Sequence, residues 1–245
     1  MRVLRSPCFV FSDVHLGVTP PEVERALLGF LDHVRDAAGS VIINGDLFDF
    51  WFEWGDVIPS RHYRVLAELA DLIDSGCPVT MLGGNHDAWG GSFLREQVGI
   101  ALHDGVLRTQ FAGKPALVAH GDGLGKGDVK YRMLKRVLRS RAAVWGFRVL
   151  HPEIGMRIAT GVSTTDEKHQ HDRSSQTRAD FLEQWAREQF AEDASLGWVM
   201  CGHSHVPALV EMGAGRYYIN SGDWITNRTY VTIDDAGVPR MLTYS

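Results

Sequence analysis

Five short apolar runs in this chain each end at a loop that carries aspartate, asparagine or histidine. The runs span residues 9–11, 41–43, 78–82, 116–119 and 198–201. Runs of this length are typical of buried strands, and helical spacing marks the segments 21–34 and 63–73 between the first three. Strands that alternate with helices predict an α/β fold, in which functional residues lie at the carboxyl ends of the strands.

The five loops together supply a mixed set of side chains that can bind metal ions. They are Asp13-Val14-His15, Gly45-Asp46, Gly84-Asn85-His86-Asp87, His120-Gly121-Asp122 and Gly202-His203-Ser204-His205. Imidazole, carboxylate and amide ligands suit Mn, Fe or Zn better than Ca or Mg. Two such ions about 4 Å apart can hold a phosphoryl centre and activate water at neutral pH. Each loop alone has an ordinary structural explanation, but the whole set predicts a two-metal phosphoesterase site.

In this order the loops resemble the signature of the calcineurin-like metallophosphoesterases, D-x-H, G-D, G-N-H-D, H-G-D and G-H-x-H. The resemblance implies a four-layer αββα sandwich of the α/β (α+β) class, with residues 1–245 as a single domain. The metal ligands that it implies are Asp13, His15 and His205 for one ion, Asn85, His120 and His203 for the other, and Asp46 as the bridge. A carboxylate suits the bridging role because its two oxygens can contact two cations.

The same resemblance gives the two residues after Asn85 a catalytic role. His86 is expected to face the leaving-group oxygen as a general acid or a phosphate ligand. Asp87 is expected to hold the ring of His86 as a partner behind it.

Within this superfamily the chain resembles the UDP-2,3-diacylglucosamine pyrophosphohydrolases of lipid A synthesis. The resemblance lies in the stretches 45–52, 120–125 and 220–224 and in the basic segment that follows residue 125. It implies an acylated nucleotide-sugar substrate, cleaved to UMP and 2,3-diacylglucosamine 1-phosphate, and two Mn ions as cofactors, with Fe or Zn as alternatives. It also implies that Asp122 contacts the sugar, that Arg157 and Lys168 meet a phosphate, and that a helical insert over 126–172 caps the site.

The basic segment is the main charge feature of a chain whose net charge is −5. Its nine cations are Lys126, Lys130, Arg132, Lys135, Arg136, Arg139, Arg141, Arg148 and Arg157, opposed by Asp128 and Glu153. Apolar residues alternate with these cations at helical spacing, which fits an amphipathic helix at an anionic membrane surface. A solvated helical pair packed on the core is the plainer alternative. Nucleic acid is not expected as a specific partner, because no recognised binding motif is present.

Cysteine content and hydropathy bear on the compartment. Three widely spaced cysteines, Cys8, Cys77 and Cys201, favour a reducing compartment over a disulfide framework. Residues 1–10 lack the apolar core of a signal peptide, and no stretch of about 18 apolar residues is present. We therefore expect a cytoplasmic protein with peripheral contact at the inner face of the cell membrane. The oligomeric state is left open.

Two other functions stay open at this point. The best-known lipid A enzymes of this group have arginine where this chain has His86, which favours another two-metal phosphodiesterase or phosphomonoesterase, acting on a soluble nucleotide or a different phospholipid. A non-catalytic binding module of the same fold is the second alternative. The sequence argues against that module because no metal ligand of the signature is missing. The polar segment 164–175 is expected to form a mobile loop.

Overall fold

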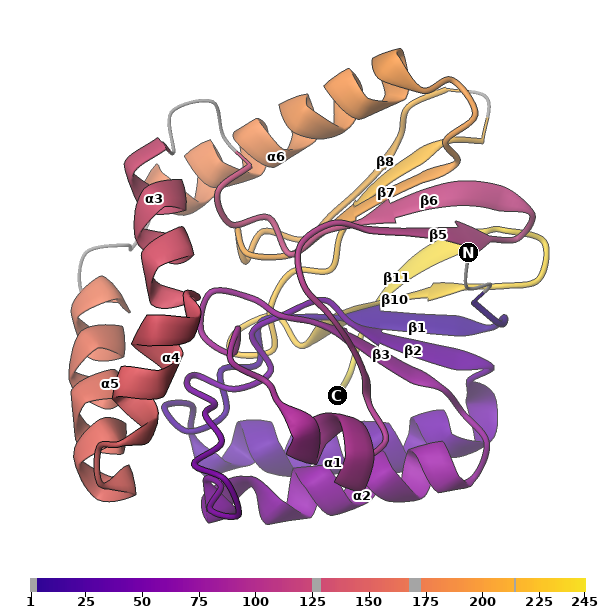
Figure 1. Cartoon of the computed structure of the whole chain (residues 1–245). Coiled ribbons are helices and arrows are strands. Elements are labelled where there is room, and N and C mark those ends of the chain that lie inside the picture. The colour runs from indigo at the N-terminus through magenta and orange to yellow at the C-terminus, as the bar shows by residue number, and fades with distance from the viewer. Residues whose placement is uncertain (1–3, 125–128, 168–172, 214) are drawn as a thin grey trace.

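Two β-sheets stack face to face, and helices cover both outer faces (Figure 1). The computed structural model describes residues 4–124, 129–167, 173–213 and 215–245. One sheet is covered by α1 (Pro21–Ala37) and α2 (Tyr63–Asp74), and the other by α6 (Arg173–Glu192). The predicted four-layer αββα sandwich is therefore confirmed.

The sheet under α1 and α2 has six strands in the order β11-β10-β1-β2-β3-β4. Their bounds are β1 (Cys8–Phe11), β2 (Ser40–Ile43), β3 (Val79–Leu82), β4 (Ala101–His103), β10 (Thr229–Ile233) and β11 (Pro239–Thr243). The strands β1, β2, β3 and β4 are parallel to one another. On the other side of β1, β10 is antiparallel to β1, and β11 is antiparallel to β10. The loops after β1, β2 and β3 consequently leave the sheet at the same edge.

The second sheet has five strands in the order β5-β6-β7-β9-β8. Their bounds are β5 (Leu107–Phe111), β6 (Lys114–Val118), β7 (Trp198–Cys201), β8 (Ala208–Glu211) and β9 (Tyr217–Asn220). The strands β6, β7 and β9 are parallel, and each edge strand is antiparallel to its neighbour. The loops that follow β6 and β7 therefore emerge side by side.

Alternating side chains of the strands build three apolar layers. In β1, Phe9 and Phe11 pack toward α1 and α2, whereas Cys8 and Val10 point between the two sheets. This alternation follows from the two-residue period of a strand. The layer under α6 contains Leu182 of that helix, whereas the neighbouring Phe181 is 55% exposed. Adjacent helical residues differ by about 100° in direction, so only one of the two can face the sheet.

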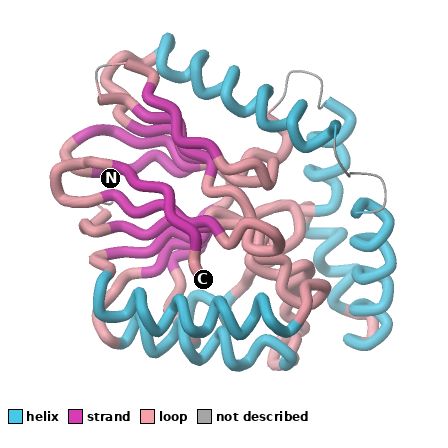
Figure 2. The backbone as a smooth tube through the Cα atoms, turned by 180° about the vertical axis from the view of Figure 1, so that it is seen from behind, coloured by secondary structure: helices cyan, strands magenta, loops and turns pink. Residues whose placement is uncertain are grey.

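Three further helices lie at the end of the molecule where the parallel strands deliver their loops (Figure 2). They are α3 (Val129–Leu138), α4 (Arg141–Arg148) and α5 (Pro152–Glu167). Phe147 of α4 packs in an aromatic cluster with Phe52, Trp54 and Trp89, and the indole N–H of Trp54 donates to the Phe147 carbonyl at 3.3 Å. The helices α3, α4 and α5 fall within the range 126–172 of the predicted insert. A capping role for that insert stays a prediction.

Several elements were not predicted from the sequence. They are β4, β5, the short helix η1 (Ser60–His62) and the π-helical turn η2 (Phe93–Gln97). The expected loop over 164–175 is wrong at both ends, because residues 164–167 belong to α5 and residues 173–175 belong to α6. Residues 168–172, which include Lys168, lie outside the described residues.

The three cysteines are buried free thiols. Burial raises the pKa of the Cys8 thiol to about 12, which suppresses its reactive thiolate form. In the described part of the chain, no helix has the length and apolar character needed to cross a membrane.

Candidate metal centre

The predicted ligands lie together at the carboxyl ends of β1, β2, β3, β6 and β7. Seven non-glycine residues of the described chain have a positive φ, and five of them belong to this group. Those five are Asp13 (56°), His15 (50°), Asp46 (52°), His203 (63°) and His205 (61°). This backbone conformation is costly for a residue with a Cβ and persists only where the surroundings enforce it. Its concentration here marks these loops as a functional site.

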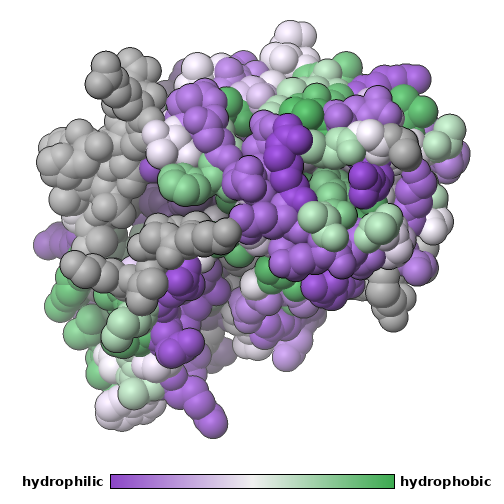
Figure 3. Space-filling view, turned by 90° about the horizontal axis from the view of Figure 1, so that it is seen from above, coloured by the Kyte–Doolittle hydropathy of each residue, from purple (hydrophilic) through white to green (hydrophobic). Residues whose placement is uncertain are grey.

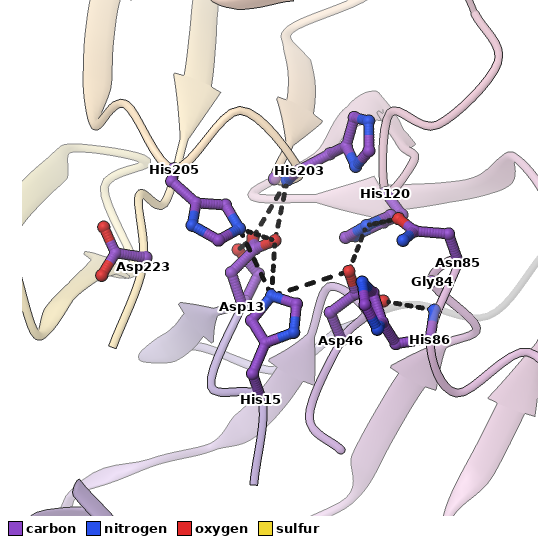
Figure 4. A network of polar contacts seen from close by, with 12 residues as sticks. Asp13, His15, Asp46, Gly84, Asn85, His86, His120, His203, His205 and Asp223 are labelled. Carbon is purple, nitrogen blue, oxygen red and sulfur yellow. Dashed lines mark hydrogen bonds and ion pairs between the residues drawn. The ribbon is translucent and has the colours of Figure 1, made fainter. Parts of the chain in front are cut away.

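Asp46 lies at the centre of the group and is only 1% exposed (Figure 4). Its Oδ2 atom is 3.8 Å from Nε2 of His15 and 3.2 Å from Nε2 of His120. Its Oδ1 atom accepts a hydrogen bond from the main-chain N–H of His86 at 3.0 Å. One carboxylate oxygen therefore faces both predicted ligand sets, while the other is held by the backbone.

On one side of Asp46 lie the three side chains predicted for the first ion. Nε2 of His205 is 3.3 Å from Oδ1 of Asp13 and 3.3 Å from Nε2 of His15. The hydroxyl of Ser12 and the main-chain N–H of His203 donate to the Asp13 carboxylate and fix its orientation. Two imidazole nitrogens that face each other beside a carboxylate form a suitable pocket for a divalent cation.

On the other side lie the three side chains predicted for the second ion. Asp46, His120 and His203 present ligand atoms within 4.8 Å of one another, and Oδ1 of Asn85 is 3.3 Å from Nε2 of His120. Nδ1 of His120 donates to the carbonyl of Asn44 at 2.8 Å. This bond leaves Nε2 of His120 directed toward the centre, as is usual for a metal-bound histidine.

The charge states of these groups fit divalent cations. Burial, followed by the effect of His120, lowers the pKa of His203 to about 4, and burial likewise lowers the pKa of His15 to about 4. Burial alone would raise the pKa of Asp46, but the nearby imidazoles of His120, His86 and His15 hold it well below its usual range. Burial would lower the pKa of His120, but the Asp46 carboxylate beside it raises that pKa well above its usual range. The ionised carboxylates provide the negative field that divalent cations require, and a bound cation would displace the proton from such an imidazole.

His86 has a different partner from the one that we predicted. Its Nδ1 donates to the carbonyl of Asp49 at 3.0 Å and lies 3.3 Å from Oδ1 of the same residue. The Asp87 carboxylate instead accepts hydrogen bonds from the main-chain N–H groups of Leu47 at 2.7 Å and of Gly84 at 2.9 Å. It accepts two longer ones, at 3.3 Å each, from the N–H groups at positions 46 and 48. The prediction that Asp87 holds the His86 ring is therefore wrong, because the loop directs that carboxylate to the backbone around Asp46.

The predicted substrate contacts are more dispersed. Asp122 is buried beside the centre and accepts hydrogen bonds from Tyr131 and Lys135 of α3. Arg157 lies on an exposed part of α5, at a cavity between that helix and the segment before α2. Lys168 lies outside the described residues, so its prediction stays untested.

Sequence reasoning missed residues that support the ligands from behind. Ser12 contacts Ser221 at 2.7 Å in addition to Asp13, and Asn44 donates from its side chain to the Ala119 carbonyl at 3.0 Å. Both are polar residues at the ends of fully buried strands, and that position is the signal by which the sequence could have identified them.

Several known proteins resemble this chain in sequence or in structure. Residues 7–207 match the family model described as calcineurin-like phosphoesterase. A protein of Porphyromonas gingivalis named UDP-2,3-diacylglucosamine hydrolase is 28% identical over 94% of this chain and 95% of its own length. A protein of the same name from Pseudomonas fluorescens is 28% identical over 93% and 92%. Among solved structures, a dimetal phosphatase from Danio rerio is 13% identical, with a TM-score of 0.48 over 98% of this chain and 100% of that one.

Gly84 gives a direct test of the centre. A Cβ at this position would lie 2.0 Å from Oδ1 of Asp46 and 2.7 Å from its main-chain nitrogen. We expect Gly84→Ala to displace Asp46 and to weaken Mn binding by at least about tenfold, roughly the effect of losing one charge-assisted contact. Gly83→Ala is the matched control, because its Cβ would meet its neighbours only at 3.4 Å. Equal Mn affinities of the two variants in calorimetry would contradict this account.

Proposed function

The chain belongs to the calcineurin-like phosphoesterase family, and we therefore propose that it hydrolyses the pyrophosphate of UDP-2,3-diacylglucosamine with two bound metal ions. The products are UMP and 2,3-diacylglucosamine 1-phosphate. The observation that carries the two-metal part is the position of Asp46 Oδ2 between His15 and His120. The substrate is supported by relatives that bear this name and match along most of their length.

The residues of the centre would divide between two ions. The first ion would be held by Asp13, His15 and His205, and the second by Asn85, His120 and His203, with Asp46 shared between them. We propose Mn as the metal, with Fe or Zn as alternatives that the same donors accept. When bound, such ions stabilise charge on phosphoryl oxygens and lower the pKa of water.

His86 is placed to handle the proton of the leaving group. The Asp49 carbonyl occupies its Nδ1–H, so Nε2 is the ring nitrogen left to face a substrate. The His86 ring lies edge-on to His15, with ring centroids 4.7 Å apart, which places it beside the first ligand set. We propose that His86 donates a proton from Nε2 to the departing phosphate oxygen, and that Asp49 holds the ring in the required orientation.

The helices α3, α4 and α5 are proposed to hold the acylated sugar. Asp122 lies between the centre and α3 and would contact a sugar hydroxyl. A cavity of about 380 Å³ lies between α5 and the segment before α2, and both apolar and cationic side chains line it. Its lining includes Trp54, Ile58, Met156, Arg61 and Arg157. We propose that Arg157 contacts a phosphate there, while the apolar residues accept hydrocarbon.

The outer surface of these helices favours peripheral contact with a membrane. Large hydrophobic side chains gather at this end of the molecule and are more than a third exposed (Figure 3). They are Met133, Leu134, Val137, Leu138, Trp145, Val149, Ile154 and Ile158. Exposed apolar side chains gathered on neighbouring helices favour an interaction surface, and the cations of the same helices favour an anionic bilayer. We propose that the protein acts in the cytoplasm at the inner face of the cell membrane.

A second candidate function is supported by His86 itself. A histidine can donate a proton to a leaving group, whereas the arginine of the best-known lipid A enzymes practically cannot. That difference favours a phosphodiesterase or phosphomonoesterase that acts on a soluble nucleotide or another phospholipid. The metal centre would serve either substrate.

Product analysis of the Mn-loaded protein with UDP-2,3-diacylglucosamine separates the two functions. We expect release of UMP, which phosphorus NMR detects. We expect Asp46→Asn to lose that release, because the substitution weakens both ligand sets. Soluble UDP-sugars provide the comparison, and the acylated substrate should have the higher kcat/KM. Faster turnover of the soluble compounds, or hydrolysis of an aryl phosphate without any UMP release, would reject the lipid substrate in favour of the second candidate.

The role of His86 can be tested separately from metal binding. We expect His86→Ala to lower kcat by about 10²- to 10⁴-fold, the usual contribution of a general acid, and to retain two Mn per chain. His33→Ala, an exposed histidine of α1, is the control and should leave both quantities unchanged. An unchanged kcat in His86→Ala would show that this ring takes no part in proton transfer.

A further inference from the structure

One face of α3 is bonded directly to the loops of the metal centre. Tyr131 and Lys135 lie one turn apart on the same side of α3, and Arg139 follows at the same spacing directly after the helix ends at Leu138. The Tyr131 hydroxyl donates to Oδ2 of Asp122 at 2.9 Å, and the Lys135 ammonium donates to the same carboxylate. Arg139 follows one turn further and reaches a different loop, where Nη2 donates to the Gly84 carbonyl at 2.9 Å.

Among the described side chains of α3, polar contacts make the attachment to the core. Tyr131 and Lys135 are half-buried, and no residue between positions 131 and 138 is buried. The opposite side of the helix is exposed, with Met133 at 63% and Val137 at 61%. The attachments of this helix to the core therefore include bonds to the loop that carries His120 and Asp122.

The Gly84 peptide links Arg139 to two predicted ligands. The carbonyl that Arg139 bonds belongs to the peptide that leads into Asn85, so its orientation sets where the Asn85 side chain begins. The Cα of Gly84 lies against Asp46, with no room for a Cβ between them. The N–H of Gly84 donates to Asp87, and the carbonyl of Gly84 accepts from Arg139. The two bonds together fix both peptide groups of this glycine. A bond from a guanidinium is stronger than one from a neutral donor.

We infer that Arg139 is a positioning residue of the metal centre. It holds the Gly84 carbonyl so that Asn85 and Asp46 keep their places, and it ties α3 to the second ligand set. This inference rests on the two-metal part of the proposed function, and it does not depend on which phosphoester is the substrate.

Two variants of Arg139 and a control on α3 test this role. Arg139→Gln removes the charged donor, Arg139→Lys retains one, and Arg136→Gln removes an exposed cation. Mn affinity is measured by calorimetry, and kcat and KM are measured with bis(p-nitrophenyl) phosphate, a small substrate. Thermal unfolding of each variant checks that the chain remains folded.

We expect Arg139→Gln to weaken binding of one Mn by about tenfold, comparable to the loss of one hydrogen bond to a charged group, and to lower kcat with KM nearly unchanged. Arg139→Lys should recover part of both effects, and Arg136→Gln should match the wild type. If Arg139→Gln binds Mn and turns over substrate like Arg136→Gln, the inference is wrong. A raised KM with unchanged kcat and Mn affinity also overturns it, because Arg139 would then be a substrate contact.

The calorimetric result separates this inference from the proposed function. A wild type that binds two Mn but releases no UMP rejects the lipid substrate, and the Arg139 comparison still decides the positioning role. A wild type that binds no Mn overturns both.

Discussion

The buried carboxylate of Asp46 is the group on which the site depends. It is 1% exposed, and a carboxylate so far from water requires either opposite charge or several donors. The surrounding structure supplies both, since the His120 imidazole, whose pKa is raised, faces one oxygen and the backbone of His86 donates to the other. Gly84 leaves the space that this oxygen occupies, and the carboxylate of Asp87 anchors the loop that carries it. The remaining ligands are arranged around this point.

The two sheets bring those ligands together from distant parts of the chain. Asp13 and Asp46 follow neighbouring parallel strands of one sheet, and His120 and His203 follow neighbouring parallel strands of the other. Stacking of the sheets over one apolar layer then places the two pairs opposite each other (Figure 4). The strained backbone at Asp13, Asp46 and His203 is held in place because the strands before these loops are fully buried.

Much of this arrangement could be predicted from the sequence, for identifiable reasons. The strands β1, β2, β3 and β7 are buried at every position, so continuous apolar runs revealed them, whereas β4 is half-exposed throughout and left no such run. The order of the polar loops indicated which side chains would converge. The partner of His86 could not be predicted, because it depends on how the loop turns: Asp49 is distant in sequence but adjacent in space, and the neighbouring Asp87 points away. The bond from Arg139 to Gly84 was equally invisible, since no sequence pattern records a contact to a main-chain carbonyl.

The central claim is that Asp46 joins two metal ions into one centre, and electron paramagnetic resonance of the Mn-loaded protein tests it most directly. Two Mn ions about 4 Å apart and bridged by one carboxylate are magnetically coupled. The account predicts that the spectrum at two equivalents of Mn shows an exchange-coupled pair, and that Asp46→Asn abolishes the coupling. A spectrum of isolated Mn ions at every loading of the wild-type protein would contradict it.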